Sequence, residues 1–173
     1  MSPQSKYPPM LGFAAHSGAG KTTLLTHLLP IFRSRGLRVG MIKHAHHHFD
    51  IDQPGKDSYE LRKAGATQML VASSRRWALM VEQEQEQDPA LEQLLQHLDL
   101  ALLDLILVEG FKREHFDKIE VHRAAANQPL LYPDDDTIIA VASDEPLSAK
   151  IPVLDLNKPG NIAGFIMDRF LKK

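Results

Sequence analysis

Apolar and polar positions follow one another in blocks that predict alternating strands and helices. Residues 10–15 form a short apolar run, which a glycine- and serine-rich turn ends at residues 16–20, as expected of a buried strand. Residues 23–35 repeat apolar positions at a helical spacing, and Gly36 follows where a left-handed C-cap is expected. Residues 37–43 return to strand character. A strand, loop, helix and strand within about 35 residues form the unit of which parallel sheets are built.

The rest of the chain predicts a hairpin, further strands and further helices. Residues 67–72 and 77–82 are strand-like and separated by a polar turn, which favours an antiparallel hairpin. A helix is expected over residues 89–98, since proline suits a first helical turn. Additional strands are expected at residues 104–108, 118–122, 137–141 and 152–156. The fold class is therefore α/β, with a mostly parallel sheet between two layers of helices and an antiparallel hairpin beside it.

Two helix starts carry side chains that can cap them. Asp57 is expected to cap a helix over residues 58–64, with Glu60 three residues later completing a capping box. Asn157 is expected to cap a closing helix that runs through about Leu171 and contains a proline in its first turn.

Composition narrows the class of protein. A chain of 173 residues with 43% apolar content can bury a real core, and we expect a flexible tail over residues 1–9 and one domain over residues 10–173. No apolar run reaches the ~18 residues of a membrane span, and a net charge of -2 argues against a nucleic-acid or membrane-surface partner. The N-terminus has no signal-peptide pattern, so a cytoplasmic location is expected. With no cysteine, thiol catalysis and thiolate metal sites are excluded.

The turn between the first strand and the first helix matches a phosphate-binding loop. The sequence from Ala15 to Thr23 fits the pattern G-x-x-x-x-G-K-[ST], except that Ala15 replaces the first glycine. Small residues let backbone N–H groups approach phosphate oxygens, Lys21 supplies charge to the β and γ phosphates, and Thr22 can ligate Mg²⁺. The nucleotide-binding residues expected are His16, Ser17, Gly18, Ala19, Gly20, Lys21, Thr22 and Thr23.

A second part of this site is expected at the end of a buried strand. Glu109 follows the apolar run 104–108, at the carboxyl end where open α/β sheets bind ligands. Glu109 is therefore a candidate magnesium ligand and, with Lys21, a candidate catalytic residue. The alternative is a strand that simply ends in solvent. Asp104, at the opposite end of the run, is less suited to the site.

A histidine-rich segment after residue 43 leaves three interpretations open. If it is extended, His44, His46, His48, Asp50 and Asp52 share one face, which could present ligands to zinc or nickel. Alternatively the segment overhangs the phosphates, so that its acids reach Mg²⁺ directly or through water. The histidines could also be merely solvated. Asp50 and Asp52 are both magnesium candidates, and the sequence does not separate them.

Several stretches taken together match a known family. They are Phe13-Ala14-Ala15 through Lys21-Thr22-Thr23, Ile42-Lys43-His44 with the histidines that follow, Pro54 through Ala66, Arg76 through Met80, and Asp104 through Lys112. With these residues the chain closely resembles the molybdopterin-guanine dinucleotide biosynthesis protein B family, whose members share the alanine at position 15. The resemblance spans about residues 10–112, and residues 137–155 also look similar.

The resemblance implies a P-loop NTPase fold that binds GTP and Mg²⁺, hydrolyses GTP slowly and forms a homodimer. It also implies contact with molybdopterin or its guanine dinucleotide form, and with the partner guanylyltransferase that joins GMP to molybdopterin. The function expected is that of a GTP-binding adaptor in molybdenum cofactor maturation.

Guanine preference rests on the resemblance. The motif N-K-x-D, which often reads guanine, has its nearest match at residues 157–160, where the final aspartate is missing and Asn157 is better explained as a helix cap. Asp144, which follows a predicted strand, could offer the base an acid instead.

Two other functions are compatible with the sequence. A P-loop small-molecule kinase would need a cationic lid, for which Lys112, Arg113 and Arg123 could supply charge. A nickel- or zinc-delivery GTPase would use the cluster from His44 to His48. No residue has the pattern of an efficient hydrolytic base, so weak GTPase activity is the most that we expect.

Overall fold

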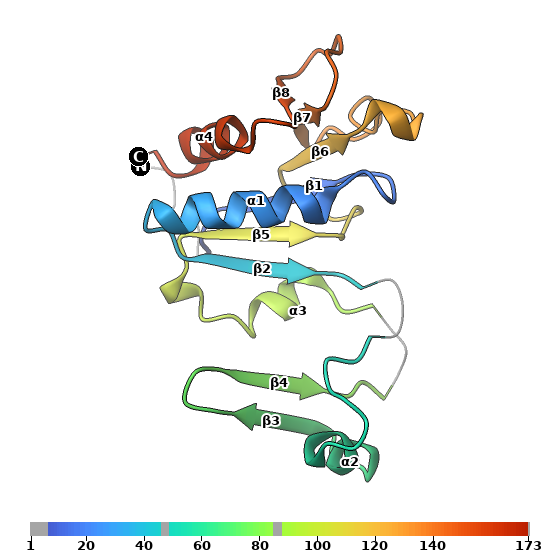
Figure 1. Ribbon diagram of the computed structural model, residues 1–173, viewed down its shortest axis with the longest axis vertical. Coiled ribbons are helices and arrows are strands. Elements are labelled where there is room, and N and C mark those ends of the chain that lie inside the picture. Colours follow the sequence, from blue (N-terminus) through green and yellow to red (C-terminus); the bar gives the residue numbers. More distant parts are fainter. Residues whose placement is uncertain (1–6, 46–48, 85–87, 173) are drawn as a thin grey trace. The chain divides into compact units, whose positions relative to one another are not determined.

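The computed structural model describes residues 7–45, 49–84 and 88–172. The chain divides into two units, one made of Met1–His44 with Leu91–Lys173 and the other of Ala45–Ala90 (Figure 1). None of the helices within the described ranges combines the length and the apolar composition that a bilayer-crossing segment needs.

The first unit is built on six parallel strands in the order β2-β5-β1-β6-β7-β8. The strands are β1 (Met10–Ala14), β2 (Val39–Lys43), β5 (Leu105–Glu109), β6 (Lys118–His122), β7 (Ile138–Ser143) and β8 (Val153–Asp155). All five side chains of β5 are buried, as expected of a strand inside a parallel sheet with both faces covered. Because the strands are parallel, their carboxyl ends meet at one edge of the sheet.

Helices cover both faces of this sheet. α1 (Lys21–Ser34) and α4 (Pro159–Phe170) contact each other and pack on one face, where Leu28, Phe32 and Ile166 are fully buried (Figure 1). α3 (Leu91–Leu95) packs on the other face through Leu91 and Leu95. Short 3₁₀ turns lie at Leu100–Leu102 and Ala124–Ala126. The three-layer α/β/α architecture expected from the sequence is confirmed.

The second unit contains one helix and a hairpin. α2 (Asp57–Lys63) contacts β3 (Gln68–Ala72), which pairs antiparallel with β4 (Trp77–Val81). One face of the hairpin carries Leu70, Trp77, Leu79 and Val81, whose residues are 61%, 66%, 40% and 48% exposed. The expected hairpin is confirmed, and the hairpin leaves this apolar face accessible.

Both helix caps expected from the sequence are wrong. α2 begins at Asp57 itself, its N-cap is Lys56 and it has no side-chain cap, while the Glu60 carboxylate accepts the N–H of Gly55 at 3.3 Å. α4 begins at Pro159, and its N-cap is Lys158 rather than Asn157. The proline ring already supplies the backbone angle of a first helical turn and removes one N–H that a cap would satisfy.

The helix expected over residues 89–98 is shorter in the structure. α3 ends at Leu95, and the next N–H groups bond carbonyls three residues back, as Gln96 to Gln93 at 3.2 Å and Leu98 to Leu95 at 3.2 Å. Such tight turns continue the helix for only a few residues.

Candidate phosphate-binding site

Two glycines shape the turn between β1 and α1. Gly18 and Gly20 have φ angles of 79° and 91°, in the left-handed region that residues with a Cβ rarely adopt. Gly20 is the N-cap residue of α1. The side chains of Ala15 and Ala19 are buried beneath the turn, at 1% and 3% exposure. The alanine that departs from the phosphate-loop pattern therefore lies in the core.

The start of α1 supplies hydrogen-bond donors. The first intrahelical bond recorded is from the Leu24 N–H to the Gly20 carbonyl at 2.9 Å. The N–H groups of Lys21, Thr22 and Thr23 precede it, and first-turn N–H groups of a helix have no intrahelical acceptor. Together with the positive end of the helix dipole, these donors favour an anion at this turn.

The loop is anchored on its outer side. The Nε2 atom of His16 lies 3.0 Å from the Pro129 carbonyl oxygen, which joins the loop to the connection between β6 and β7. Inside the loop, the Ala19 N–H donates to the His16 carbonyl at 3.4 Å. His16 therefore holds the loop through its side chain and its backbone.

Lys21 lies in a group of charges. Burial lowers the pKa of Lys21, the carboxylate of Glu109 opposes this, and the ammonium groups of Lys112 and Lys43 lower the pKa further. Lys21 is thus repelled by the ammonium groups of Lys112 and Lys43 and attracted by the carboxylate of Glu109. A polyphosphate would relieve this repulsion, which makes the turn electrostatically suited to such a ligand.

Glu109 ends β5 beside the phosphate loop. It lies opposite Phe13 of β1 and opposite Lys43 of β2, and the Lys43 Nζ is 3.2 Å from its carboxylate. The His44 N–H donates to the Glu109 carbonyl at 2.8 Å. Glu109 is thus buried at the carboxyl edge of the sheet, where the sequence places it, and it is ion-paired rather than solvated.

The chain turns sharply after Glu109. Gly110 has a φ angle of 98° and Phe111 a φ angle of 52°, which is uncommon for a residue with a side chain. A Cβ at Gly110 would meet the Cβ of His44 at 2.6 Å, so only glycine fits here. The rings of His44 and Phe111 pack with centroids 5.1 Å apart. The ends of β2 and β5 are therefore locked together beside the phosphate loop.

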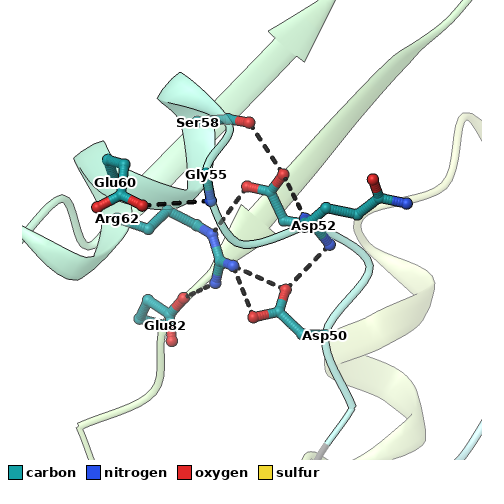
Figure 2. A network of polar contacts seen from close by, with 8 residues as sticks. Asp50, Asp52, Gly55, Ser58, Glu60, Arg62 and Glu82 are labelled. Atoms are coloured by element: carbon teal, nitrogen blue, oxygen red, sulfur yellow. Dashed lines mark hydrogen bonds and ion pairs between the residues drawn. The ribbon is translucent and has the colours of Figure 1, made fainter.

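Asp50 and Asp52 belong to the second unit, where they surround a buried arginine (Figure 2). Arg62 Nη2 donates to both oxygens of Asp50 at 2.7 and 2.9 Å, and Arg62 Nε lies 3.5 Å from Asp52 Oδ2. Arg62 also pairs with Glu82, and the Ser58 hydroxyl donates to Asp52 at 3.0 Å. The hydrogen bond from Arg62 holds the pKa of Asp50 below its usual value.

The metal roles expected for these acids stay predictions. The Arg62 guanidinium already pairs with Asp50 and Asp52, and the described parts of the chain contain no group of three or more His, Cys, Asp or Glu side chains that could hold a metal ion. The cluster expected from His44 to His48 lies largely outside the described residues, since the structure describes only His44 of its histidines.

Asp104 lies at the opposite end of β5, as expected. Its carboxylate accepts hydrogen bonds from the Arg38 guanidinium at 3.1 Å and from the Arg38 N–H at 2.8 Å. These bonds hold the pKa of Asp104 below its usual value. Asp104 therefore fastens the start of β5 to the start of β2, away from the phosphate loop.

A cavity beside α1 was not expected from the sequence. Its volume is about 320 Å³, and it is lined by Thr23, Leu24 and His27 of α1 together with Arg123, Leu156, Asn157 and Pro159. Arg123 follows β6 directly and Asn157 comes two residues after β8, at the edge where α/β sheets bind ligands. A position just after a strand could have marked both residues as ligand-binding. The sequence instead suggested only a lid charge for Arg123 and a helix cap for Asn157.

Comparisons with known proteins agree on one family. The model of the molybdopterin guanine dinucleotide synthesis protein B family matches residues 10–144. The molybdopterin-guanine dinucleotide biosynthesis adapter protein of Escherichia coli K12 is 51% identical over 166 residues, which are 95% of each chain. The adapter protein of Haemophilus influenzae is 43% identical over 159 residues, covering 91% of this chain and 87% of its own.

Solved structures agree with the fold. A crystal structure of a molybdopterin-guanine biosynthesis protein B superposes with a TM-score of 0.72 at 28% identity, covering 92% of this chain and 98% of that one.

Proposed function

Because the chain belongs to the molybdopterin guanine dinucleotide synthesis protein B family, we propose that it is a GTP-binding adapter protein of molybdopterin guanine dinucleotide biosynthesis that hydrolyses GTP slowly. The adapter role is that of the Escherichia coli relative, which is similar along almost the whole chain. The partners proposed with it are molybdopterin or its guanine dinucleotide form and the guanylyltransferase of the same pathway.

One observation carries the nucleotide part of this proposal. Gly18 and Gly20 take the left-handed conformation in the turn that leads into α1, the first N–H groups of this helix have no intrahelical acceptor, and Lys21 is its first residue. Convergent amides, a helix N-terminus and an ammonium group are the arrangement that holds nucleotide phosphates in P-loop proteins. The preference for guanine comes from the family.

Thr22 and Glu109 fit a magnesium ion in their chemistry. Thr22 is exposed in the first turn of α1, and Glu109 ends the strand next to β1. A hydroxyl and a carboxylate are hard oxygen ligands of the kind that Mg²⁺ prefers, and the ion supplies charge neutralisation for phosphate oxygens when it is bound. Glu109 is held in place by Lys43, and in this proposal it would bind such an ion directly or through water.

Slow hydrolysis follows from the groups near the phosphate loop. Lys21, Lys43 and Lys112 stabilise phosphate charge, but they do not remove a proton from an attacking water. Glu109 is a carboxylate near Lys21, and its ion pair with Lys43 would have to be broken for it to act as a base. We therefore expect GTP turnover well below the ~1–100 s⁻¹ of kinases.

A nucleotide panel tests the assignment. GTP and ATP are titrated with and without Mg²⁺ by calorimetry, and the products are then identified. Tighter binding of GTP with Mg²⁺ and slow release of free phosphate support the proposal. Rapid unassisted turnover, or a phosphorylated metabolite as product, contradicts it.

The Lys21→Ala variant tests the site itself. We expect it to bind GTP at least about tenfold more weakly, since it removes a charge from the phosphate contacts, and to keep the wild-type circular dichroism spectrum and melting temperature. Lys150→Ala, an exposed lysine in the connection between β7 and β8, is the control. Unchanged GTP affinity in Lys21→Ala would refute the assignment.

We further propose that two copies of the chain form the homodimer implied by the resemblance, through the apolar hairpin face of Leu70, Trp77, Leu79 and Val81. β3 and β4 form a two-stranded sheet, and such a sheet is only marginally stable in water without further packing. A second hairpin would cover the exposed face with a surface of the same kind, as in a two-fold interface.

A further inference from the structure

The cavity beside α1 continues from the phosphate loop. Thr23 lies directly after Lys21 and Thr22, which are expected to hold the phosphates and Mg²⁺. It lines the cavity together with Leu24, the next residue, and His27, one helical turn further on. A nucleotide whose phosphates occupy the loop must direct its sugar and base away from it. The cavity offers that space, and its volume of about 320 Å³ suits one small organic group.

Arg123 connects the cavity with the loop. A Cβ placed on Gly20 would lie 3.0 Å from the Nε and 3.4 Å from the Nη2 of Arg123, so the guanidinium lies close against the backbone of Gly20. The same arginine lines the cavity. Its side chain therefore stands between the phosphate loop and the cavity, where the phosphate and nucleoside parts of a nucleotide would join.

The lining has the chemistry of a nucleoside site. Leu24, Leu156 and Pro159 supply apolar surface, and Asn157 supplies an amide that can both donate and accept a hydrogen bond. The planar guanidinium of Arg123 can stack on an aromatic ring. A purine base needs flat and apolar surfaces for its faces and paired donors and acceptors for its edge.

We propose that this cavity is the nucleoside subsite of the GTP site, with Arg123 and Asn157 as its binding residues and Asp144 as the positioning residue of Arg123. This inference rests on the proposed GTP binding and names the part of the chain that holds the base and sugar. It also gives Asp144 a role different from the base contact suggested by the sequence.

The contacts of Asp144 carry this role. Its Oδ1 accepts the N–H of Ala124 at 3.0 Å, and its Oδ2 lies 3.4 Å from Nη1 of Arg123. The carboxylate therefore ties the end of β7 to the two residues that follow β6. Both its oxygens are engaged by these contacts, and the guanidinium is held at the wall of the cavity.

The experiment compares a ligand that has a nucleoside with one that lacks it. GTP and inorganic tripolyphosphate are titrated by calorimetry, both with Mg²⁺, into the wild type, Arg123→Ala, Arg123→Lys and Asn157→Ala. We expect each variant to lose about tenfold or more in GTP affinity and to lose much less affinity for tripolyphosphate. Arg35→Ala, an exposed arginine at the C-cap of α1 that does not line the cavity, is the control and leaves both affinities unchanged.

A double-mutant cycle tests the positioning role of Asp144. Asp144→Asn should weaken GTP binding when Arg123 is present and should have no further effect in the Arg123→Ala background. A purely structural role would instead lower GTP affinity by the same factor in both backgrounds, and that result would overturn the role assigned to Asp144. Melting temperatures identify any variant that fails to fold, and Arg123→Lys then replaces Arg123→Ala in the comparison.

Other outcomes distinguish a failure of the nucleoside subsite from a failure of the proposed GTP binding. Unchanged GTP affinity in Arg123→Ala and Asn157→Ala, or an equal loss for GTP and tripolyphosphate, would overturn the nucleoside subsite while leaving the phosphate loop in place. A wild-type protein that binds neither ligand would instead refute the proposed function.

Discussion

At the scale of single residues, the phosphate loop depends on a backbone conformation that only glycine adopts at little cost. Gly18 and Gly20 both have positive φ angles, yet they differ in what surrounds them. No atom lies within 4 Å of a Cβ built on Gly18, whereas a Cβ on Gly20 would press on Arg123. Gly20 therefore combines a backbone requirement with a steric one.

A substitution at Gly20 separates these effects when it is compared with one at Gly36. Gly36, after α1, has a φ angle of 77° and open space around its Cβ position. We expect Gly36→Ala to lower the free energy of unfolding by about 1–2 kcal/mol, measured by urea denaturation, and Gly20→Ala to lower it more because its Cβ also presses on Arg123. Only Gly20→Ala should also weaken GTP binding. Equal GTP affinities for the two variants would count against the loop assignment.

Asp135 predicts a pH dependence of stability. Burial alone would raise the pKa of its carboxyl, but hydrogen bonds from Thr137 and the charge of Lys118 outweigh burial and hold the pKa below the ordinary 3.8. Because the folded pKa is depressed, the stabilisation is complete above about pH 3.8 and is lost as the pH falls through the folded value.

The Asp135→Asn variant tests this dependence. We expect it to lower the free energy of unfolding at pH 7 by about 1 kcal/mol, a small figure because the side chain is partly exposed. The difference from the wild type should shrink below pH 3.8. Asp136→Asn, at the exposed neighbouring position, is the control, and an Asp135→Asn effect that is constant down to pH 2 would contradict the argument.

The sequence proposes residues for the phosphate loop but none for the cavity. The loop is a contiguous pattern in which each position has its own chemical reason, so Lys21 and Thr22 can be identified without a structure. Arg123, Asp144 and Asn157 are separated in sequence and meet only because β6, β7 and β8 are neighbours. Strand order, which the sequence pattern does not specify, brings them together.

At the scale of elements, one buried acid organises the connection from β6 to β7. Glu120 is 1% exposed, and its two carboxylate oxygens accept the N–H groups of Leu131 at 2.9 Å and Tyr132 at 3.0 Å. The carbonyl of Pro129, which contacts His16 of the phosphate loop, lies just before these residues. Glu120 therefore anchors a segment that in turn supports the loop.

The Glu120→Gln variant should release this segment. Glutamine offers only one acceptor oxygen, so one of the two N–H groups would face another donor, and we expect a loss of about 1–3 kcal/mol in the free energy of unfolding. Hydrogen exchange at Leu131 and Tyr132 should accelerate more than exchange in the strands. Glu92→Gln, on the exposed side of α3, serves as the control. Unaltered hydrogen exchange at Leu131 and Tyr132 would contradict the anchoring role of the Glu120 carboxylate.

Element types follow from the sequence more reliably than element ends do. The strand over residues 118–122 is predicted to the residue, because its apolar side chains are buried in the sheet. The caps predicted at Asp57 and Asn157 are wrong because Lys56 and Lys158 take the N-cap positions, and neither supplies a side-chain cap. Asp57 enters the helix itself, while the Asn157 N–H is held by Asp155 at 2.9 Å. A side-chain cap stabilises a helix by only about 1 kcal/mol, which is less than tertiary packing contributes.

At the scale of the whole molecule, the exposed hairpin face predicts association. We expect wild-type protein to sediment as a dimer of the 19.4 kDa chain, and the double variant Trp77→Lys, Leu79→Lys to sediment as a monomer, since charge is expensive to bury in an apolar interface. Val153→Lys changes an apolar residue of β8 that is also 40% exposed, and it should leave the dimer intact. A monomeric wild type would contradict the proposed interface.

The sequence predicts three features of the overall architecture, which are the α/β class, the mostly parallel sheet and the antiparallel hairpin. It does not predict the division into two units, because no proline- or glycine-rich linker marks where the chain leaves the first unit at His44 or returns at Leu91. The sequence also does not reveal the surroundings of Asp50 and Asp52. Their partner Arg62 comes from α2, and a pattern along the chain does not reveal which helix closes over an acid.

The joined ends of β2 and β5 have a mechanical consequence. Lys43 holds Glu109, His44 is pinned to the next turn, and the chain passes into the second unit at Ala45. A triphosphate that drew the Lys43 ammonium toward itself would displace the end of β2, just before the chain enters the second unit. Binding of the proposed triphosphate would therefore act first on Lys43 and His44, where the chain leaves the first unit for the unit that carries the proposed dimer face.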